Sequence, residues 1–181
     1  GEIKKLTNLI KPHIGVITNI GEAHIENFKN IQGVAKAKSE IIEKIKPGGT
    51  IILNKDDKFF KYLFKKAKSY KLKVSTFGFH KNSDIFVKKI IKKKNSSLIY
   101  VNVKGQIMEF KINDLNIYNV LASISVLKEL KIDVLKLKNK YKNLESSEGR
   151  GKKYLIKRYN KKFRLIDESY NANPLSVKYA I

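Results

Sequence analysis

The stretch IGVITNIGEAHIENFKNIQGVAKAKSEIIEKIKPGGTIIL, residues 14–53, decides the fold class of this chain. It begins and ends with short β-branched apolar runs, at 14–18 and 50–53, which are typical of strands buried on both faces. Between these runs, apolar residues recur at helical spacing from about Ile31 to Ile45, and a Pro-Gly-Gly sequence then ends the helix. Strand, helix and strand in this order predict a βαβ unit and a parallel sheet.

The remaining segments extend this pattern. Helical spacing predicts helices at 2–10, 57–69, 116–130 and 134–144. Short apolar runs predict strands at 73–77, 154–159 and 163–167. Alternating segments predict an antiparallel β meander at 85–91, 98–103 and 107–112. We therefore expect an α/β fold with a mostly parallel sheet, flanked by helices, and a β meander beside it.

The composition limits the possible functions. The chain has 39 Lys and Arg against 16 Asp and Glu, a net charge of +23, which would suit a nucleic-acid-binding module. Arg is nevertheless rare, although base and phosphate recognition favours it, so we expect no specific nucleic-acid partner. The absence of cysteine excludes disulfides and thiolate metal sites. We expect no membrane span and a cytoplasmic location, because no apolar run approaches the roughly 18 residues that a span needs.

Lys38 interrupts the apolar stripe of the helix predicted at 31–45. The commoner interpretation is that its stem lies along the core while its ammonium group reaches water. The alternative is a lysine directed into a cleft, where burial would lower its pKa and leave a neutral amine available for chemistry. The sequence pattern alone leaves both interpretations open.

Polar residues also follow the two strands of the βαβ unit. His24 lies after the first strand, between Glu22 and Glu26, at the carboxyl edge where open α/β sheets bind ligands. Asp56 and Asp57 follow the second strand, where we expect them to cap the next helix rather than to bind a ligand.

Three further positions are candidates for a binding site. Asn116 and Asn119 lie on one face of a helix, with Asn116 suited to the N-cap and the carboxamide of Asn119 suited to the edge of adenine. Arg150 lies between two glycines. This pattern permits close approach of the backbone to an anion, but it is also typical of a simple turn. Glu168 follows what we expect to be a buried strand at the ligand edge of the sheet.

Taken together, these stretches resemble a known family. Six blocks of the sequence resemble, in order and spacing, the central ATPase domain of the Mur ligases. These blocks are NIGEAHIENF (19–28), AKAKSE (35–40), LNKDD (53–57), NIYNVLA (116–122), EGRGK (148–152) and IDESYNANP (166–174). The resemblance implies a central domain related to P-loop NTPases and an ATP-dependent amide ligase that acts through an acyl phosphate. The AHIE and SYNANP variants imply that the substrates are UDP-N-acetylmuramoyl-tripeptide and D-alanyl-D-alanine, used in peptidoglycan precursor synthesis.

The resemblance also assigns roles to residues. It implies that His24 and Lys38 bind Mg²⁺, with Lys38 carried as a carbamate. It places Asn116 and Asn119 beside the adenine of ATP, Arg150 near the phosphates and Glu168 near the ribose.

The chain departs from the family pattern in ways that suggest a piece of a longer protein. It contains no G-x-x-x-x-G-K-[ST] loop, so we expect the P-loop unit to be missing. We expect residues 1–167 to be a partial central domain, 168–174 an interdomain hinge and 175–181 the start of a C-terminal domain. This chain alone should have no ligase activity. The alternatives are a folylpolyglutamate or cyanophycin synthetase type of ligase, and the basic nucleic-acid-binding module.

Overall fold

A six-stranded sheet forms the centre of the computed structural model, which describes residues 2–21, 28, 30–93, 96–113, 116–137, 139–141, 148–149 and 151–170. Its strands follow one another in space as in sequence: β1 (Ile14–Ile17), β2 (Thr50–Asn54), β3 (Lys73–Gly78), β4 (Ile85–Lys93), β5 (Ser96–Val103) and β6 (Gln106–Ile112). Neighbours from β1 to β4 pair in parallel, and β4, β5 and β6 pair antiparallel. This confirms the predicted parallel sheet with an antiparallel meander.

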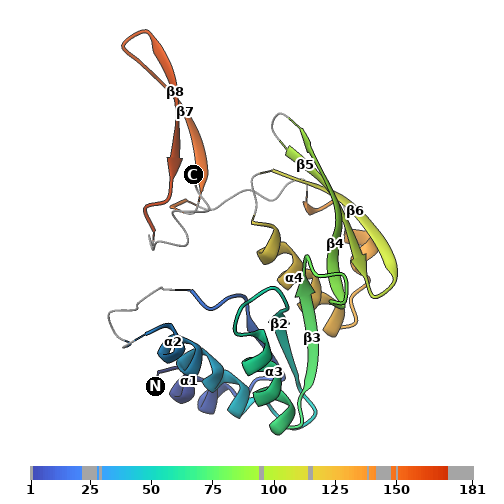
Figure 1. Ribbon diagram of the computed structural model, residues 1–181. Coiled ribbons are helices and arrows are strands. Elements are labelled where there is room, and N and C mark those ends of the chain that lie inside the picture. Colours follow the sequence, from blue (N-terminus) through green and yellow to red (C-terminus); the bar gives the residue numbers. More distant parts are fainter. Residues whose placement is uncertain are drawn as a thin grey trace.

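Strand β4 meets β3 only at the end of β3. The parallel register joins Phe77 to Ile85 and Gly78 to Phe86, and the rest of β4 pairs with β5. The meander therefore continues the sheet beyond the carboxyl ends of the parallel strands, as Figure 1 shows.

Helices cover both faces of the sheet (Figure 1). One face packs against α2 (Ile31–Lys38), the 3₁₀ helix η2 (Ser39–Lys44) and α3 (Phe60–Ser69), and the helix α1 (Glu2–Ile10) contacts η2. The other face packs against α4 (Ile117–Glu129) and the short 3₁₀ helix η3 (Val134–Leu137). Strand β2, between β1 and β3, is buried along its whole length, as its continuous run of apolar residues predicts. None of the helices in the described part of the chain has the length and apolar character needed to cross a membrane.

Three predicted helices differ from the structure. The helix expected at 31–45 changes to 3₁₀ geometry at Ser39, whose hydroxyl donates to the carbonyl of Lys36 and so competes with the helical hydrogen bonds. The helix expected from 57 begins at Phe60, because the Asp57 carboxylate accepts from the N–H of Phe59 and holds a turn there. Of the helix expected at 134–144, the described residues show 3₁₀ geometry at η3 and at Tyr141 and turns at 139–140.

Tyr141 packs on the face of the sheet that α4 covers. Its ring lies 4.8 Å from that of Phe110 on β6, and the residue is buried in the same hydrophobic cluster as α4.

The last two strands form a separate hairpin, β7 (Lys152–Arg158) and β8 (Lys161–Asp167), which lies away from the larger sheet in Figure 1. The two turn residues, Tyr159 and Asn160, both have positive φ, as a tight two-residue hairpin turn requires. The expectation that the strand before Glu168 is buried was wrong, because every residue of β8 up to Ile166 is exposed. Its apolar side chains are 44% to 47% exposed.

Candidate functional site

The loops after β1 and β2 meet at the carboxyl edge of the parallel strands. Asn54, at the end of β2, donates from its side chain to the carbonyl oxygen of Thr18 at 3.1 Å. The carboxylate of Asp57 accepts from the N–H of Ile20 at 2.7 Å. These bonds fix the start of the NIGEAHIENF block against the LNKDD block, at the edge where open α/β sheets bind their ligands.

Lys38 joins this edge from the last turn of α2. Its Nζ donates to the backbone carbonyl oxygen of Asn19 at 3.0 Å. Burial lowers the pKa of Lys38, and the negative charge of Asp57 partly opposes that effect. Lys38 is half-buried and its amine faces the loop after β1. The lowered pKa has the direction that the second interpretation of Lys38 expects.

A polar network behind Lys38 holds the end of α2 in place. The buried hydroxyl of Ser39 accepts from Nζ of Lys66 at 3.0 Å, and the same Nζ donates to Glu43 at 2.8 Å. This network connects α2 and η2 to α3. It therefore fixes the backbone that carries Lys38.

The start of α4 belongs to the same edge. Asn116 caps the helix, with Oδ1 accepting from the N–H groups of Tyr118 and Asn119 at 2.9 and 3.4 Å. Asn119 lies in the first turn with its side chain exposed. The Tyr118 hydroxyl donates to Asp56 at 3.2 Å, which brings the NIYNVLA block against the LNKDD block.

The expected capping role of the two aspartates was wrong. The N-cap residue of α3 is Phe59, and no side chain makes a cap hydrogen bond there. Asp57 instead bridges the loop after β1 to the turn before α3, and Asp56 binds the segment after β3 and the Tyr118 hydroxyl. Sequence reasoning therefore missed Asp56 as a site residue, although its place after a buried strand was a usable signal.

The two remaining blocks meet each other at the base of the hairpin. The carboxylate of Asp167 accepts from the N–H of Gly149 at 3.0 Å, and Tyr170 donates its N–H to the carbonyl of Gly149 at 3.1 Å. Hydrogen bonds from Ser169 lower the pKa of Asp167. Gly149 has φ of +71°, and a Cβ there would lie 2.7 Å from that of Tyr170, so the close approach requires glycine. Glu168 follows β8 beside this contact and is half-buried.

Two predicted site residues, His24 and Arg150, lie outside the described residues. Within the described ranges, no group of three or more His, Asp or Glu side chains is arranged to hold a metal ion. The predicted pairing of Lys38 with His24 therefore stays a prediction.

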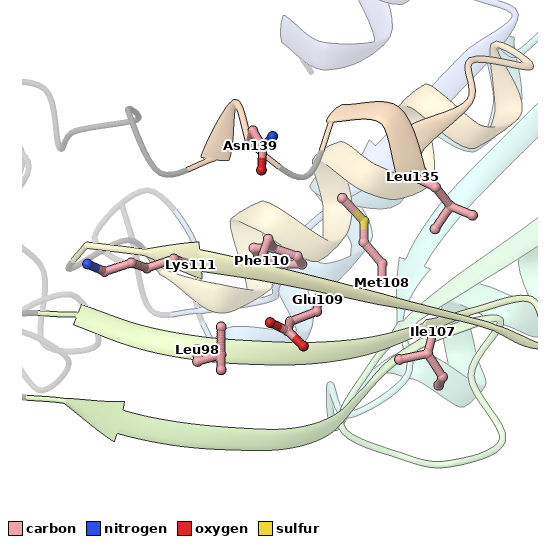
Figure 2. A pocket seen from close by; sticks show the side chains of 8 residues that line it. All are labelled: Leu98, Ile107, Met108, Glu109, Phe110, Lys111, Leu135 and Asn139. Carbon is pink, nitrogen blue, oxygen red and sulfur yellow. The ribbon is translucent and has the colours of Figure 1, made fainter.

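A pocket of about 460 Å³ lies elsewhere, between β5, β6 and the segment that carries η3 (Figure 2). Its lining includes Met108, Phe110 and Leu135, and none of the predicted site residues. We therefore base the functional proposal on the carboxyl edge and not on this pocket.

Known proteins resemble this chain in sequence and in fold. The family profile described as the Mur ligase middle domain matches residues 1–127. The chain belongs to the Mur ligase family. Its likeness to this family extends past the profile, because a UDP-N-acetylmuramoyl-tripeptide–D-alanyl-D-alanine ligase of Buchnera aphidicola is 35% identical over 100% of the chain and 40% of that relative. The ligase of the same name from Bacillus subtilis is 26% identical over 100% of the chain and 38% of its own length.

Solved structures of Mur ligases share the fold. MurF from Acinetobacter baumannii superimposes with a TM-score of 0.84 at 26% identity, covering 98% of this chain and 38% of that one. MurF from Thermotoga maritima, in complex with ADP, gives a TM-score of 0.80 at 23% identity over 99% of this chain and 40% of that one, a likeness of fold alone. The chain thus spans about two fifths of the length of the Mur ligases it matches.

Proposed function

We propose that this chain is the central part of an ATP-dependent amide ligase that joins D-alanyl-D-alanine to UDP-N-acetylmuramoyl-tripeptide. The observation that carries the proposal is the 35% identity, over the whole chain, to a ligase whose name states this reaction. The arrangement at the carboxyl edge supports it, because four of the six family-like blocks contact one another there. A peptidoglycan precursor ligase is favoured over the nucleic-acid-binding module, since the family match accounts for those blocks and a high lysine content does not.

Ligases of this family use ATP and Mg²⁺. The donors at the carboxyl edge suit a hard cation, because the Asn19 carbonyl, the Asp57 carboxylate and a carbamate on Lys38 would all offer oxygen. A protonated lysine could not serve as a ligand. We propose that Lys38, as a carbamate, and His24 hold Mg²⁺, which when bound would offset the repulsion between a carboxylate and a triphosphate.

The reaction that we propose has two steps. The terminal carboxylate of the tripeptide attacks the γ-phosphorus of ATP, the bond to the β,γ-bridging oxygen breaks, and an acyl phosphate and ADP form. The amine of D-alanyl-D-alanine then attacks the acyl carbon, loses a proton, and expels inorganic phosphate as the amide forms. The residues of this chain would bind and orient ATP during these steps.

On the nucleotide side, we propose that Asn119 pairs with the adenine edge while Asn116 keeps the first turn of α4 in place through its cap. Arg150 would lie near the phosphates and Glu168 near the ribose. The contact of Gly149 with Asp167 and Tyr170 supports this grouping, because it holds the neighbours of Arg150 and Glu168 together. We further propose that 1–167 belong to the central domain, 168–174 to the hinge and 175–181 to a C-terminal domain.

The test is phosphate release by the complete protein supplied with ATP, Mg²⁺ and both substrates. We expect turnover that requires the tripeptide and D-alanyl-D-alanine together, and no turnover from the 181-residue chain alone. Turnover with a folate and glutamate in place of these substrates would overturn the proposal in favour of a folylpolyglutamate synthetase. The apo structure of FPGS from L. casei shares only the fold, with a TM-score of 0.66 at 15% identity.

A further inference from the structure

The carboxylate of Asp56 binds two segments that are distant in sequence. Its Oδ2 accepts from the backbone N–H of Phe79 at 2.5 Å, and its Oδ1 accepts from that of His80 at 3.1 Å. Oδ2 also accepts from the Tyr118 hydroxyl at 3.2 Å. One side chain on the loop after β2 thus holds both the segment after β3 and the first turn of α4.

The same three elements bring two aromatic rings together. The rings of Phe79 and Tyr118 lie 5.3 Å apart in an edge-to-face arrangement, with Phe79 40% exposed. Gly78 makes room for the Asp56 carboxylate, because a Cβ at that position would lie 2.6 Å from Oδ2 of Asp56. The close approach of the carboxylate to the segment after β3 therefore depends on glycine.

Asp56 is also connected to the Lys38 side of the site. Its backbone N–H donates to Oδ1 of Asn54, whose Nδ2 donates to the carbonyl of Thr18. The next residue along the chain, Asn19, accepts the hydrogen bond from Lys38. A run of hydrogen bonds thus crosses the carboxyl edge from the loop after β1 to the start of α4.

We infer that Asp56 is a positioning residue for the nucleobase of ATP, acting through Tyr118 and the backbone of Phe79. This inference rests on the proposed function. Asp56 is exposed, and hydrogen bonds at exposed positions contribute little to the stability of a fold. Three hydrogen bonds to one exposed carboxylate are therefore better explained by a role in positioning the bonded segments than by a role in stability. What they place is the first turn of α4, with Asn119 and the Phe79–Tyr118 ring pair beside it.

The mechanism follows from the fixed geometry that base recognition requires. A carboxamide discriminates between purines only if its donor and acceptor are held in register with the base edge. Without the Asp56–Tyr118 bond, the first turn of α4 would have more freedom, and each binding event would have to order it. ATP binding and base preference would weaken, whereas the chemistry at the triphosphate would not change.

The test uses the complete ligase with the variants Tyr118→Phe and Asp56→Asn. We expect Tyr118→Phe to raise KM for ATP about fivefold, the effect of losing one hydrogen bond of ordinary strength. Asp56→Asn should raise it about tenfold or more, because an amide NH₂ would also face a backbone N–H. Both variants should reduce the preference for ATP over GTP. Neither should change KM for D-alanyl-D-alanine or kcat at saturating ATP.

Two variants serve as matched controls. Tyr70→Phe removes a hydroxyl at the far end of α3, and Asp133→Asn removes an exposed carboxylate that pairs with Lys136. Both should retain the parental KM and base preference. A parental KM for ATP in Tyr118→Phe and Asp56→Asn would overturn the inference. A loss of kcat with unchanged KM and base preference would also overturn it, because a general structural role would act in that way.

A binding measurement separates this inference from the proposed function. Calorimetric titration of the complete protein with MgATP and with MgGTP needs no turnover. If the parent binds ATP but ligates neither proposed substrate, the proposed function fails, and weaker, less selective ATP binding by Tyr118→Phe still supports the inference. If the parent ligates its substrates and Tyr118→Phe binds both nucleotides as the parent does, the inference alone fails.

Discussion

Nζ of Lys38 lies 3.0 Å from the backbone carbonyl oxygen of Asn19, so the amine of α2 is held at the carboxyl edge of β1. The bond connects the AKAKSE block to the NIGEAHIENF block, between residues that are 19 positions apart in the sequence. Burial lowers the pKa of this amine, which increases the fraction of neutral amine at a given pH. A neutral amine is the form that reacts with CO₂, and this links the packing of Lys38 to the proposed carbamate.

Lys38→Ala in the complete ligase should reduce kcat by at least about a hundredfold, because an anionic ligand to the proposed Mg²⁺ would be lost. Added formate or acetate should restore part of the activity by supplying a carboxylate in the space that the side chain leaves. Lys36→Ala, an exposed lysine on the same helix, is the matched control and should keep parental activity. Full activity in Lys38→Ala would remove the carbamate assignment.

Asn116 and Asn119 should respond differently to substitution. Asn119→Ala should raise KM for ATP about tenfold, because the proposed contact with adenine would be lost. Asn116→Ala should mainly destabilise α4, by about 1 kcal/mol, and Asn116→Ser should restore most of that loss by supplying another cap. Steady-state kinetics and hydrogen exchange of the α4 amides measure the two effects. An unchanged KM in Asn119→Ala would contradict its proposed role.

The Glu43–Lys66 pair should make the support behind Lys38 sensitive to acid. The hydrogen bond from Lys66 lowers the pKa of Glu43 in the folded chain below the ordinary value of 4.5. The stabilisation is therefore fully present above that value and is lost as the pH falls through the folded pKa. Because the Glu43 side chain is 21% exposed, Glu43→Gln should cost no more than about 1 kcal/mol at pH 7.

Hydrogen exchange of the η2 and α3 amides, followed from pH 7 to pH 3, measures this effect. The difference between Glu43→Gln and the parent should shrink as the pH falls. Glu40→Gln, on the same short helix, is the matched control for charge removal. A difference that stays constant down to the lowest pH would contradict the role of the ionised carboxylate.

Gly78→Ala should loosen the segment after β3. Gly78 has φ of +152°, a conformation that L residues rarely adopt, and its added Cβ would lie against Asp56. We expect a loss of at least about 2 kcal/mol in the opening free energy of the β3 amides, measured by native-state hydrogen exchange. Gly48→Ala is the control, because Gly48 has φ of +76° with nothing within 4 Å of the added Cβ. Equal effects of the two substitutions would show that the contact with Asp56 is unimportant.

The parallel sheet was predictable because its signals are local. The run at 50–53 is apolar without interruption, and in the structure β2 is buried along its whole length between helices. The start of α4 was predictable for the same reason, since Asn116 makes the cap that its residue type favours. Lys38 was recognisable because it replaces an aliphatic residue in an otherwise apolar stripe.

What the sequence did not reveal depends on contacts between distant segments. The hydrogen bond from Tyr118 to Asp56 spans 62 residues, and no local pattern indicates which donor an exposed aspartate will meet. The end of α2 at Lys38 depends on Ser39 and Lys66, which meet only after α3 has packed. The expectation of a buried strand before Glu168 was wrong because β8 pairs only with β7, in its own two-stranded sheet.

The most direct test of the account is an anomalous-diffraction crystal structure of the complete protein with Mn²⁺ and a non-hydrolysable ATP analogue. We predict a cation about 2.1–2.3 Å from both a carbamate oxygen on Lys38 and a ring nitrogen of His24. An unmodified Lys38 amine, with residues 24 and 38 directed to different surfaces and the cation bound elsewhere, would contradict the account.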